Sequence, residues 1–367
     1  MTLTRDDAIF AHGVIRYPVH CSCRSGREDG AMTDHPGISM SLELRYHPSL
    51  EQRALADTFN DSIKALLPLD RLHASHSESE RVWQQLEDVG LFTACLDEEA
   101  GGSGLGAAEE ALIVMELGRR LACSSVIATI GATHAKDIGE SPVSGRTWRA
   151  AAAYRNGARI VSIGGDKADA VLLRDGDGAA LHRNSGTMGT IDATLWYENL
   201  HEGAALQSSI AEFDAKGVRR LRLIDAAVLA GIAVTALDTG VAYAGERRQF
   251  GRPIGGFQAV KHHCANMAIA ARNARDQVGF ASVAIDEDRE DAALQVDCAL
   301  LVAGTAALRN TAANIQIHGG IGFSEEALPH ILLKRARLLI AIAGGLEAAN
   351  VRIADASAGP AACRGNA

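Results

Sequence analysis

Two glycine-containing segments hold the residues whose types and spacing are best suited to chemistry. The first, Arg247 to Phe257, reads Arg-Arg-Gln-Phe-Gly-Arg-Pro-Ile-Gly-Gly-Phe and follows a long helical pattern. A guanidinium suits phosphate oxygens because it is a planar, permanently charged donor. The second, Gln316 to Phe323, reads Gln-Ile-His-Gly-Gly-Ile-Gly-Phe, and bare glycines let a ligand or another backbone approach closely. Taken singly, each segment is equally typical of a turn between two helices.

Together, at this spacing, the two segments resemble the acyl-CoA dehydrogenases. The resemblance covers roughly residues 48 to 357 and includes the loop Glu98 to Gly106 and the stretch Ala168 to Leu173. It implies two helical domains around a β domain, a dimer of dimers, and FAD at a subunit interface. It also implies that Arg247 and Gln249 contact the FAD pyrophosphate of the neighbouring subunit. The other cofactor-binding residues implied are Phe250, Ile254 and Phe257 around the cofactor, and Gln316, Gly319 and Gly320 against its ADP portion.

The catalytic base of the family is missing from its usual positions in this sequence. In the family that this sequence resembles, a carboxylate removes the α-proton of a thioester while the β-hydrogen leaves as a hydride to the flavin. Counting without gaps, the Glu of the usual Glu-Gly-Thr turn falls on Ala343, which Gly344 and Gly345 follow. A minority of members place the Glu on the first helix of the bundle, and that position falls on Leu221. Neither residue can accept a proton.

Asp225 is the nearest candidate base, because it lies one helical turn beyond Leu221 on the same face. Burial in an apolar helix would raise its pKa, as a base for a weakly acidic C–H requires. The alternatives are that Asp225 caps, pairs with Arg222 or faces solvent. Arg222 matches an Arg of the family and is a candidate substrate contact. Glu347 is expected to project elsewhere.

The elements around these segments predict a mainly α fold. Ser49 and Gln52 form a capping-box pattern before a helix, and further helical patterns cover 79–89 and about 107–121. Short β-type runs follow at 161–163, 170–174, 179–182 and 194–198, with a hairpin signal at Asp175 to Gly178. They predict a small β unit of five strands at most. Long helical stretches then cover 221–247, 257–285, 292–317 and 325–342, as a long four-helix bundle requires.

These patterns divide the chain into five parts: a disordered extension (1–40), an N-terminal helical domain (41–132), a small middle β domain (133–217), a C-terminal four-helix bundle (218–357) and a tail (358–367). Met40 is a plausible alternative start to Met1. The β domain is shorter than that of the resembling family and lacks its Thr-Glu-Pro-like segment, so the contacts of the flavin ring are less determined than those of the pyrophosphate.

Composition excludes several classes of protein. The chain has 367 residues, with 36 basic and 45 acidic residues and a net charge of -9, so nucleic acid is not expected as a partner. The longest charge-free runs, 121–135 and 310–324, are too short and too polar to span a membrane. Seven scattered cysteines without a Cys-x-x-Cys motif argue against disulfides and a zinc ribbon, and therefore favour the cytoplasm. His20, Cys21 and Cys23 lack a second ligand pair, so no metal site is expected.

Two functions remain open. The first is an FAD-dependent acyl-CoA dehydrogenase, a homo-oligomeric tetramer that uses Asp225 or another carboxylate and passes electrons from an acyl-CoA to an electron-transfer flavoprotein. The second is a non-catalytic partner that completes the FAD site in an α2β2 hetero-oligomer, as in members acting on steroid-derived CoA thioesters. The missing bases and the short β domain fit the second function, whereas the FAD segments fit both. His262, His263 and His318 are expected to be structural or surface residues.

Overall fold

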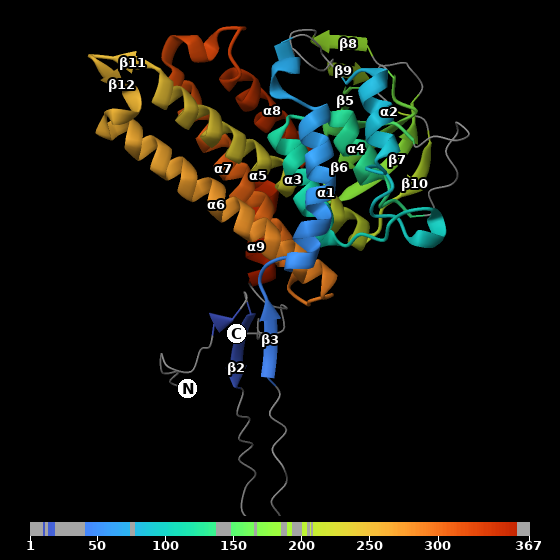
Figure 1. Ribbon diagram of the computed structural model, residues 1–367. Coiled ribbons are helices and arrows are strands. Elements are labelled where there is room, and N and C mark those ends of the chain that lie inside the picture. Colours follow the sequence, from blue (N-terminus) through green and yellow to red (C-terminus); the bar gives the residue numbers. More distant parts are fainter. Residues whose placement is uncertain are drawn as a thin grey trace, which may run out of the picture.

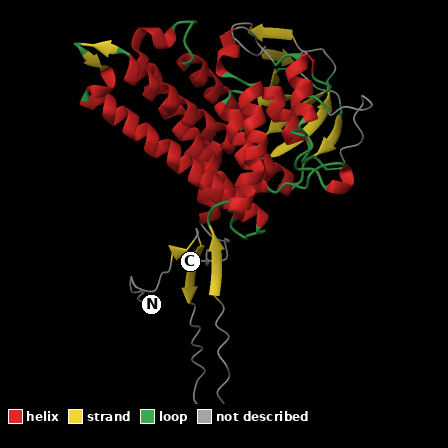
Figure 2. Ribbon diagram, in the orientation of Figure 1, coloured by secondary structure: helices red, strands yellow, loops and turns green. Residues whose placement is uncertain are grey.

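The structure is a computed structural model that describes residues 10–11, 14–18, 41–73, 78–136, 148–164, 167–184, 189–192, 200–203, 206 and 208–357. A helical unit, a β-sheet and a helical bundle follow one another along the chain (Figure 1). The predicted fold class is therefore confirmed. The bundle helices α5, α6 and α7 extend away from the sheet, and the two helical parts make up most of the molecule (Figure 2).

The N-terminal unit contains α1 (Leu50–Leu66), α2 (Glu80–Asp88), α3 (Ala107–Arg119) and α4 (Ser124–Ala132), with short 3₁₀ turns η1 (Leu69–His73) and η2 (Glu98–Ala100). The predicted capping box is present, since the Ser49 hydroxyl accepts from the Gln52 amide and the Gln52 side chain accepts from the Ser49 amide. Within the range 1–40, the structure describes β1 (Phe10–Ala11) and β2 (Val14–Pro18), which pair in a small sheet with β3 (Ser41–Arg45).

Among the described residues, the middle sheet has seven strands in the order β10-β7-β6-β4-β5-β9-β8. Their bounds are β4 (Ala150–Asn156), β5 (Arg159–Ile163), β6 (Ala170–Asp175), β7 (Gly178–Arg183), β8 (Gly189–Asp192), β9 (Leu200–Gly203) and β10 (Ser209–Glu212). Strands β4 and β6 are parallel, and the other pairs are antiparallel. The predicted hairpin joins β6 to β7, with Gly176 at a positive φ of 58° in its turn.

The expected limit of five strands is too low. The alanine-rich strand β4 carries no β-branched residue to indicate it, yet its small side chains let α4 and α8 pack against it. The strands β8 to β10 are only four residues each, too short for a pattern to show. The strand expected at 194–198 lies outside the described residues.

The C-terminal bundle contains α5 (Ala215–Glu246), α6 (Gln258–Asp286), α7 (Ala292–His318), α8 (Pro329–Ile342) and α9 (Leu346–Ser357). Helix α5 crosses α3 at very close range. A Cβ added to Gly231 would lie 2.1 Å from the Met115 carbonyl oxygen, and one added to Gly118 would lie 2.3 Å from the Val228 carbonyl oxygen. The two glycines therefore let the N-terminal unit and the bundle share one core.

Helix α7, together with the turn after it, is long and apolar enough by length and composition to cross a membrane. In the structure it packs against α5, α6, α8 and α9. This burial inside the bundle explains its apolar composition, because a core helix passes the same test as a membrane span.

Candidate functional site

The first glycine-containing segment forms a small hairpin at the end of the bundle farthest from the sheet (Figure 1). Helix α5 ends at Glu246, and β11 (Arg248–Gln249) pairs with β12 (Arg252–Pro253) before the 3₁₀ turn η4 (Ile254–Gly256). At the tip, Phe250 and Gly251 have positive φ angles of 51° and 80°. Phe250 is 90% exposed. The hairpin therefore presents an aromatic ring to the outside at the cost of an unfavourable backbone conformation.

The second segment lies at the same end, because α7 runs back toward it and ends at His318. The His318 ring stacks on Tyr243 of α5 with centroids 4.0 Å apart, and its Nδ1 lies 2.9 Å from the Asn314 carbonyl oxygen. Burial lowers the pKa of His318. The imidazole thus joins the last turns of α5 and α7, which is a structural role of the kind expected. Gly319, at φ 65°, then turns the chain into η5 (Gly319–Phe323).

The residues of this distal end fit a dinucleotide diphosphate. Arg247, Gln249, Gln316, Gly319 and Gly320 are all exposed. Arg247 forms no ion pair with another described residue. A Cβ added to Gly319 or Gly320 would meet nothing within 4 Å, so the glycine backbone is open to a flat ligand. Free guanidinium donors beside open backbone are the chemistry that a pyrophosphate and an adenosine require.

Apolar side chains surround these polar groups at the surface. Phe323 is 72% exposed and Ile321 is 48% exposed, in addition to Phe250. Ile254 and Phe257 are half-buried, and Arg252 stacks on the Phe257 ring at 4.0 Å. Large apolar groups that are exposed together indicate contact with another molecule. The distal end therefore has the exposed apolar and polar groups of a contact surface.

Leu221 and Asp225, two of the three positions considered for the base, line one cavity toward the opposite end of α5. Leu221, Ile224 and Asp225 of α5 face Leu339 and Ile342 of α8 across a small cavity. Strands β4 and β6 and helix α4 complete its wall. The cavity has a volume of about 20 Å³, which is room for about one water molecule. An acyl chain does not fit into it.

Asp225 is buried beside this cavity and faces a cation. Its Oδ2 lies 3.0 Å from Nη1 of Arg174 on β6, and the two side chains are 7% and 9% exposed. The two groups are in ion-pair contact, although no described residue is aligned to form a hydrogen bond with Oδ2. Burial raises the pKa of Asp225, and the charges of Arg174 and Arg222 oppose this rise.

The other predicted positions carry no base in the structure. Ala343 is buried and ends α8, and the glycines after it have φ angles of 85° and 86°. Gly344 and Gly345 donate to the Ala341 and Ile340 carbonyl groups, so the turn closes the helix end. Glu347 is exposed on α9.

Arg222 belongs to an ion-pair network that joins three parts of the fold. Its Nη2 lies 2.6 Å from Asp177 in the β6–β7 turn, and Arg352 of α9 also contacts Asp177, at 3.1 Å. Arg352 in turn lies 2.8 Å from Asp297 of α7. Desolvation lowers the pKa of Arg222. Arg222 does not pair with Asp225, and its contacts hold the bundle to the sheet.

The cofactor segments and the base positions are far apart within one chain. Asp225 and Arg247 are separated by 22 residues of a continuous helix, which corresponds to about 33 Å at about 1.5 Å per residue. The structure therefore brings the eight cofactor-type residues together at one end of the bundle, and leaves Arg222 and Asp225 at the other.

Sequence reasoning missed two buried ionic groups. The first group is Arg174, the last buried residue of the apolar strand β6. A charged residue within an apolar strand pattern is the sequence signal that could have indicated a buried ion pair. The second group is Glu110 of α3, whose Oε1 lies 2.6 Å from Nε2 of His134 and whose Oε2 lies 2.9 Å from Nε of Arg220. Burial by itself would raise the pKa of Glu110, but the charges of His134 and Arg220 lower it to about 2. This cluster links α3, α5 and the end of α4.

The described residues contain no group of three or more His, Cys, Asp or Glu side chains that could hold a metal ion. His20, Cys21 and Cys23 lie outside the described part of the chain. His262 and His263 are exposed on α6, as expected.

A helical unit, a middle sheet and a long bundle with a diphosphate-type surface at its distal end together define a flavin-dependent dehydrogenase fold. Two family models match the chain: the N-terminal domain of acyl-CoA dehydrogenase over residues 49–139 and its C-terminal domain over residues 215–358. The chain belongs to the acyl-CoA dehydrogenase family, whose cofactor is FAD.

Similar proteins include the acyl-CoA dehydrogenase IpdE2 of Mycobacterium tuberculosis, which is 31% identical over 286 residues, covering 75% of this chain and 84% of IpdE2. Among solved structures, one in the ChsE4–ChsE5 complex of the same organism has a TM-score of 0.65 at 22% identity, covering 87% of this chain and 100% of that chain. One from the Tcur3481–Tcur3483 steroid acyl-CoA dehydrogenase has a TM-score of 0.67 at 23% identity, covering 84% and 97%. These two structures support the fold.

Proposed function

We propose that this chain is the subunit of an α2β2 acyl-CoA dehydrogenase that completes an FAD site, while an unlike chain supplies the catalytic base. The observation that carries the proposal is the small size of the cavity beside Asp225. The cavity offers about 20 Å³, and Asp225 is paired with Arg174 at 3.0 Å. A base must reach the proton it removes, and a cavity of this size has no room for a thioester beside the carboxylate.

The separation of the two ends of α5 also supports the proposal that this chain binds the cofactor and another chain supplies the base. The distal residues lie about 33 Å along the helix from Asp225. A cofactor bound at the distal surface therefore meets reacting groups that another chain provides. In this proposal the exposed apolar side chains Phe250 and Phe323 lie at the contact between the two chains.

The residues of the distal end would hold the cofactor. Arg247 donates to the diphosphate, with Gln249 and Gln316 as further polar contacts, and the open backbone at Gly319 and Gly320 admits the adenosine. When bound, FAD supplies the hydride acceptor. Charge-assisted bonds to a diphosphate fix its position as well as its charge.

The substrate class and the electron acceptor belong to the proposal as well. The solved relatives include a steroid acyl-CoA dehydrogenase and the ChsE4–ChsE5 complex of unlike chains. By analogy we propose a steroid-derived CoA thioester as the substrate of the assembly and an electron-transfer flavoprotein as its acceptor.

A second candidate function is dehydrogenation by this chain itself with Asp225 as base. The raised pKa of Asp225 favours it, since a general base works best with a pKa near the working pH. It requires Arg174 to move away and the cavity to open toward the flavin.

The two candidates differ in the isolated protein. We expect the full-length chain purified alone to leave its flavin oxidised with any acyl-CoA, and to support bleaching only when co-expressed with a base-carrying acyl-CoA dehydrogenase chain of the same organism. Absorbance at the flavin band and mass by sedimentation are the measurements. The second candidate would be established instead if the chain alone bleached its flavin with an acyl-CoA and Asp225→Asn abolished this bleaching.

Restoring a base offers a further test of the conclusion drawn from the small cavity. Ala343→Glu places a carboxylate where most family members carry it, on a buried position at the end of α8. We expect this variant alone to remain inactive, because the cavity leaves no room for the thioester. A gain of bleaching in Ala343→Glu would show that the cavity opens and would overturn the conclusion drawn from its size.

A further inference from the structure

One face of α7 carries a row of polar side chains that contact the neighbouring helices. Asn310, Asn314 and His318 follow one another at intervals of four residues, so they lie on the same face of the helix. Asn310 and Asn314 are only 1% and 0% exposed. Because burying an amide costs free energy unless it is hydrogen-bonded, the partners of these two side chains restrict how α7 can lie in the bundle.

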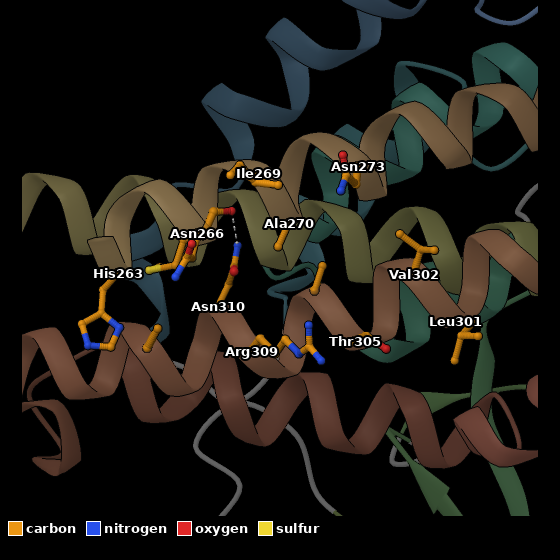
Figure 3. Close-up of a pocket in the computed structure, with 13 residues that line it drawn as sticks. His263, Asn266, Ile269, Ala270, Asn273, Leu301, Val302, Thr305, Arg309 and Asn310 are labelled. Atoms are coloured by element: carbon orange, nitrogen blue, oxygen red, sulfur yellow. Dashed lines mark hydrogen bonds between the residues drawn. The ribbon is translucent and has the colours of Figure 1, made fainter. Parts of the chain in front are cut away.

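Asn310 ties α7 to two other helices about two turns before α7 ends. Its amide nitrogen donates to the Ala233 carbonyl oxygen of α5 at 3.0 Å and to the Met267 carbonyl oxygen of α6 at 2.9 Å. Figure 3 shows Asn310 reaching from α7 toward α6 at a groove of about 580 Å³ between these helices. Because one amide donates to carbonyl groups on two helices, a shift of α7 along its axis would break at least one of these bonds.

Asn314 and His318 join α7 to α5 at the distal end. The Asn314 amide nitrogen donates to Thr239 Oγ1 at 3.0 Å, and the His318 ring stacks on Tyr243 with centroids 4.0 Å apart. On each helix the two contacting residues are four positions apart, so both contacts belong to one register of the parallel helices. The contacts therefore fix the height at which α7 ends relative to α5.

Gly240 makes the space in which the Asn314 side chain lies. A Cβ added to Gly240 would be 3.1 Å from Asn314 Oδ1, which is shorter than an ordinary van der Waals contact. The residues one turn away on α5 are Ala236 and Ala244, and both are buried. The space for the amide therefore exists at the observed register and is filled by a Cβ atom at the registers one turn away.

We propose that Asn314 and His318 are positioning residues of the FAD site. They hold the ends of α5 and α7 at one relative height, so that Arg247, Gly319 and Gly320 can reach the same dinucleotide. A shift of α7 by one turn would move the two glycines by about 5.4 Å relative to Arg247, which is farther than a hydrogen bond can stretch. The inference rests on the part of the proposed function that assigns the distal end to FAD, and it holds whichever chain supplies the base.

The test is the affinity for FAD of the full-length protein in its flavin-containing assembly, measured by titration of the apoprotein. We expect His318→Ala to weaken binding by about tenfold, the equivalent of one lost hydrogen bond to a charged group. His318→Phe keeps a ring against Tyr243 and should stay within about threefold of the wild type. Asn314→Leu removes the bond to Thr239 and should resemble His318→Ala. The control, Leu300→Ala, truncates a fully buried residue earlier on α7 and should lower stability without changing FAD affinity.

A double-mutant cycle with Arg247 separates positioning from a general loss of stability. If His318 places the glycines relative to the guanidinium, His318→Ala should matter less once Arg247→Ala has removed that contact. Strictly additive losses, an equal loss in Leu300→Ala, or wild-type affinity in either His318→Ala or Asn314→Leu would overturn the inference and leave the assignment of FAD to the distal end in place. Full FAD affinity in Arg247→Ala would overturn that assignment and the inference with it.

Discussion

The buried pair of Arg174 and Asp225 gives the sharpest test of the electrostatics beside the small cavity. Arg174→Met removes the cation and keeps most of the apolar side chain. At the Nη1–Oδ2 distance of 3.0 Å, an effective dielectric constant of about 20 gives an attraction of about 5.5 kcal/mol. Desolvation of both groups offsets much of this attraction. Leaving one buried charge without its partner therefore costs about 3–5 kcal/mol of unfolding free energy.

Removing both charges should cost little. Arg174→Met/Asp225→Leu replaces the pair by apolar groups, and such replacements are often neutral or stabilising. Urea unfolding of the wild type, the two single variants and the double variant forms a double-mutant cycle that isolates the interaction. Losses below about 1 kcal/mol in both single variants would show that water reaches the pair, since that is the range of surface pairs.

The same variant should respond to pH with a defined sign. Burial holds the pKa of Asp225 above its ordinary value of 3.8, and Arg174 opposes this rise. In Arg174→Met the pKa of Asp225 therefore rises further. A raised pKa means that the folded state prefers the protonated acid, so the variant should be closest to the wild type below pH 3.8 and should lose stability as the pH rises through the folded pKa. An equal loss at low and neutral pH would refute the raised pKa.

Three further predictions follow from other contacts. Arg247→Ala should weaken FAD binding by roughly ten- to a hundredfold, since a charge-assisted hydrogen bond contributes about 1.5–3 kcal/mol. Flavin titration of the assembled protein measures this affinity. Full retention of flavin would refute the assignment of Arg247 to the FAD diphosphate. Gly231→Ala should destabilise the protein by more than about 1–3 kcal/mol, because its Cβ would lie 2.1 Å from the Met115 carbonyl oxygen. The control is Gly245→Ala on the same helix, whose Cβ would meet nothing within 4 Å. It should be neutral or slightly stabilising in the same unfolding assay. Glu110→Gln should cost about 3 kcal/mol at neutral pH. The lowered pKa of Glu110 stabilises the wild type above pH 4.5, and this contribution is lost as the pH falls toward about 2, so the variant should lack that part of the acid dependence.

Local patterns in the sequence determine the helices and the two cofactor-type segments. The capping box at Ser49 and the apolar periodicity of α5 to α7 are properties of neighbouring residues, and the structure confirms them. The distal segments are recognisable because each is a continuous run of residues. That they share one end of the bundle depends on the parallel course of α5 and α7, which both end there and whose last turns are joined by the stacking of Tyr243 on His318.

Only the tertiary structure decided what Asp225 and Arg222 contact. The sequence left Asp225 open between a base, a cap and a partner of Arg222, because all of these use nearby residues. Its actual partner, Arg174, comes from the middle sheet, and the partners of Arg222 come from a β-turn and, through Arg352, from α9. Contacts between residues so far apart in the chain depend on how the sheet packs against the bundle. Periodicity records which face of a helix is buried, but it does not record which charge another element brings to that face.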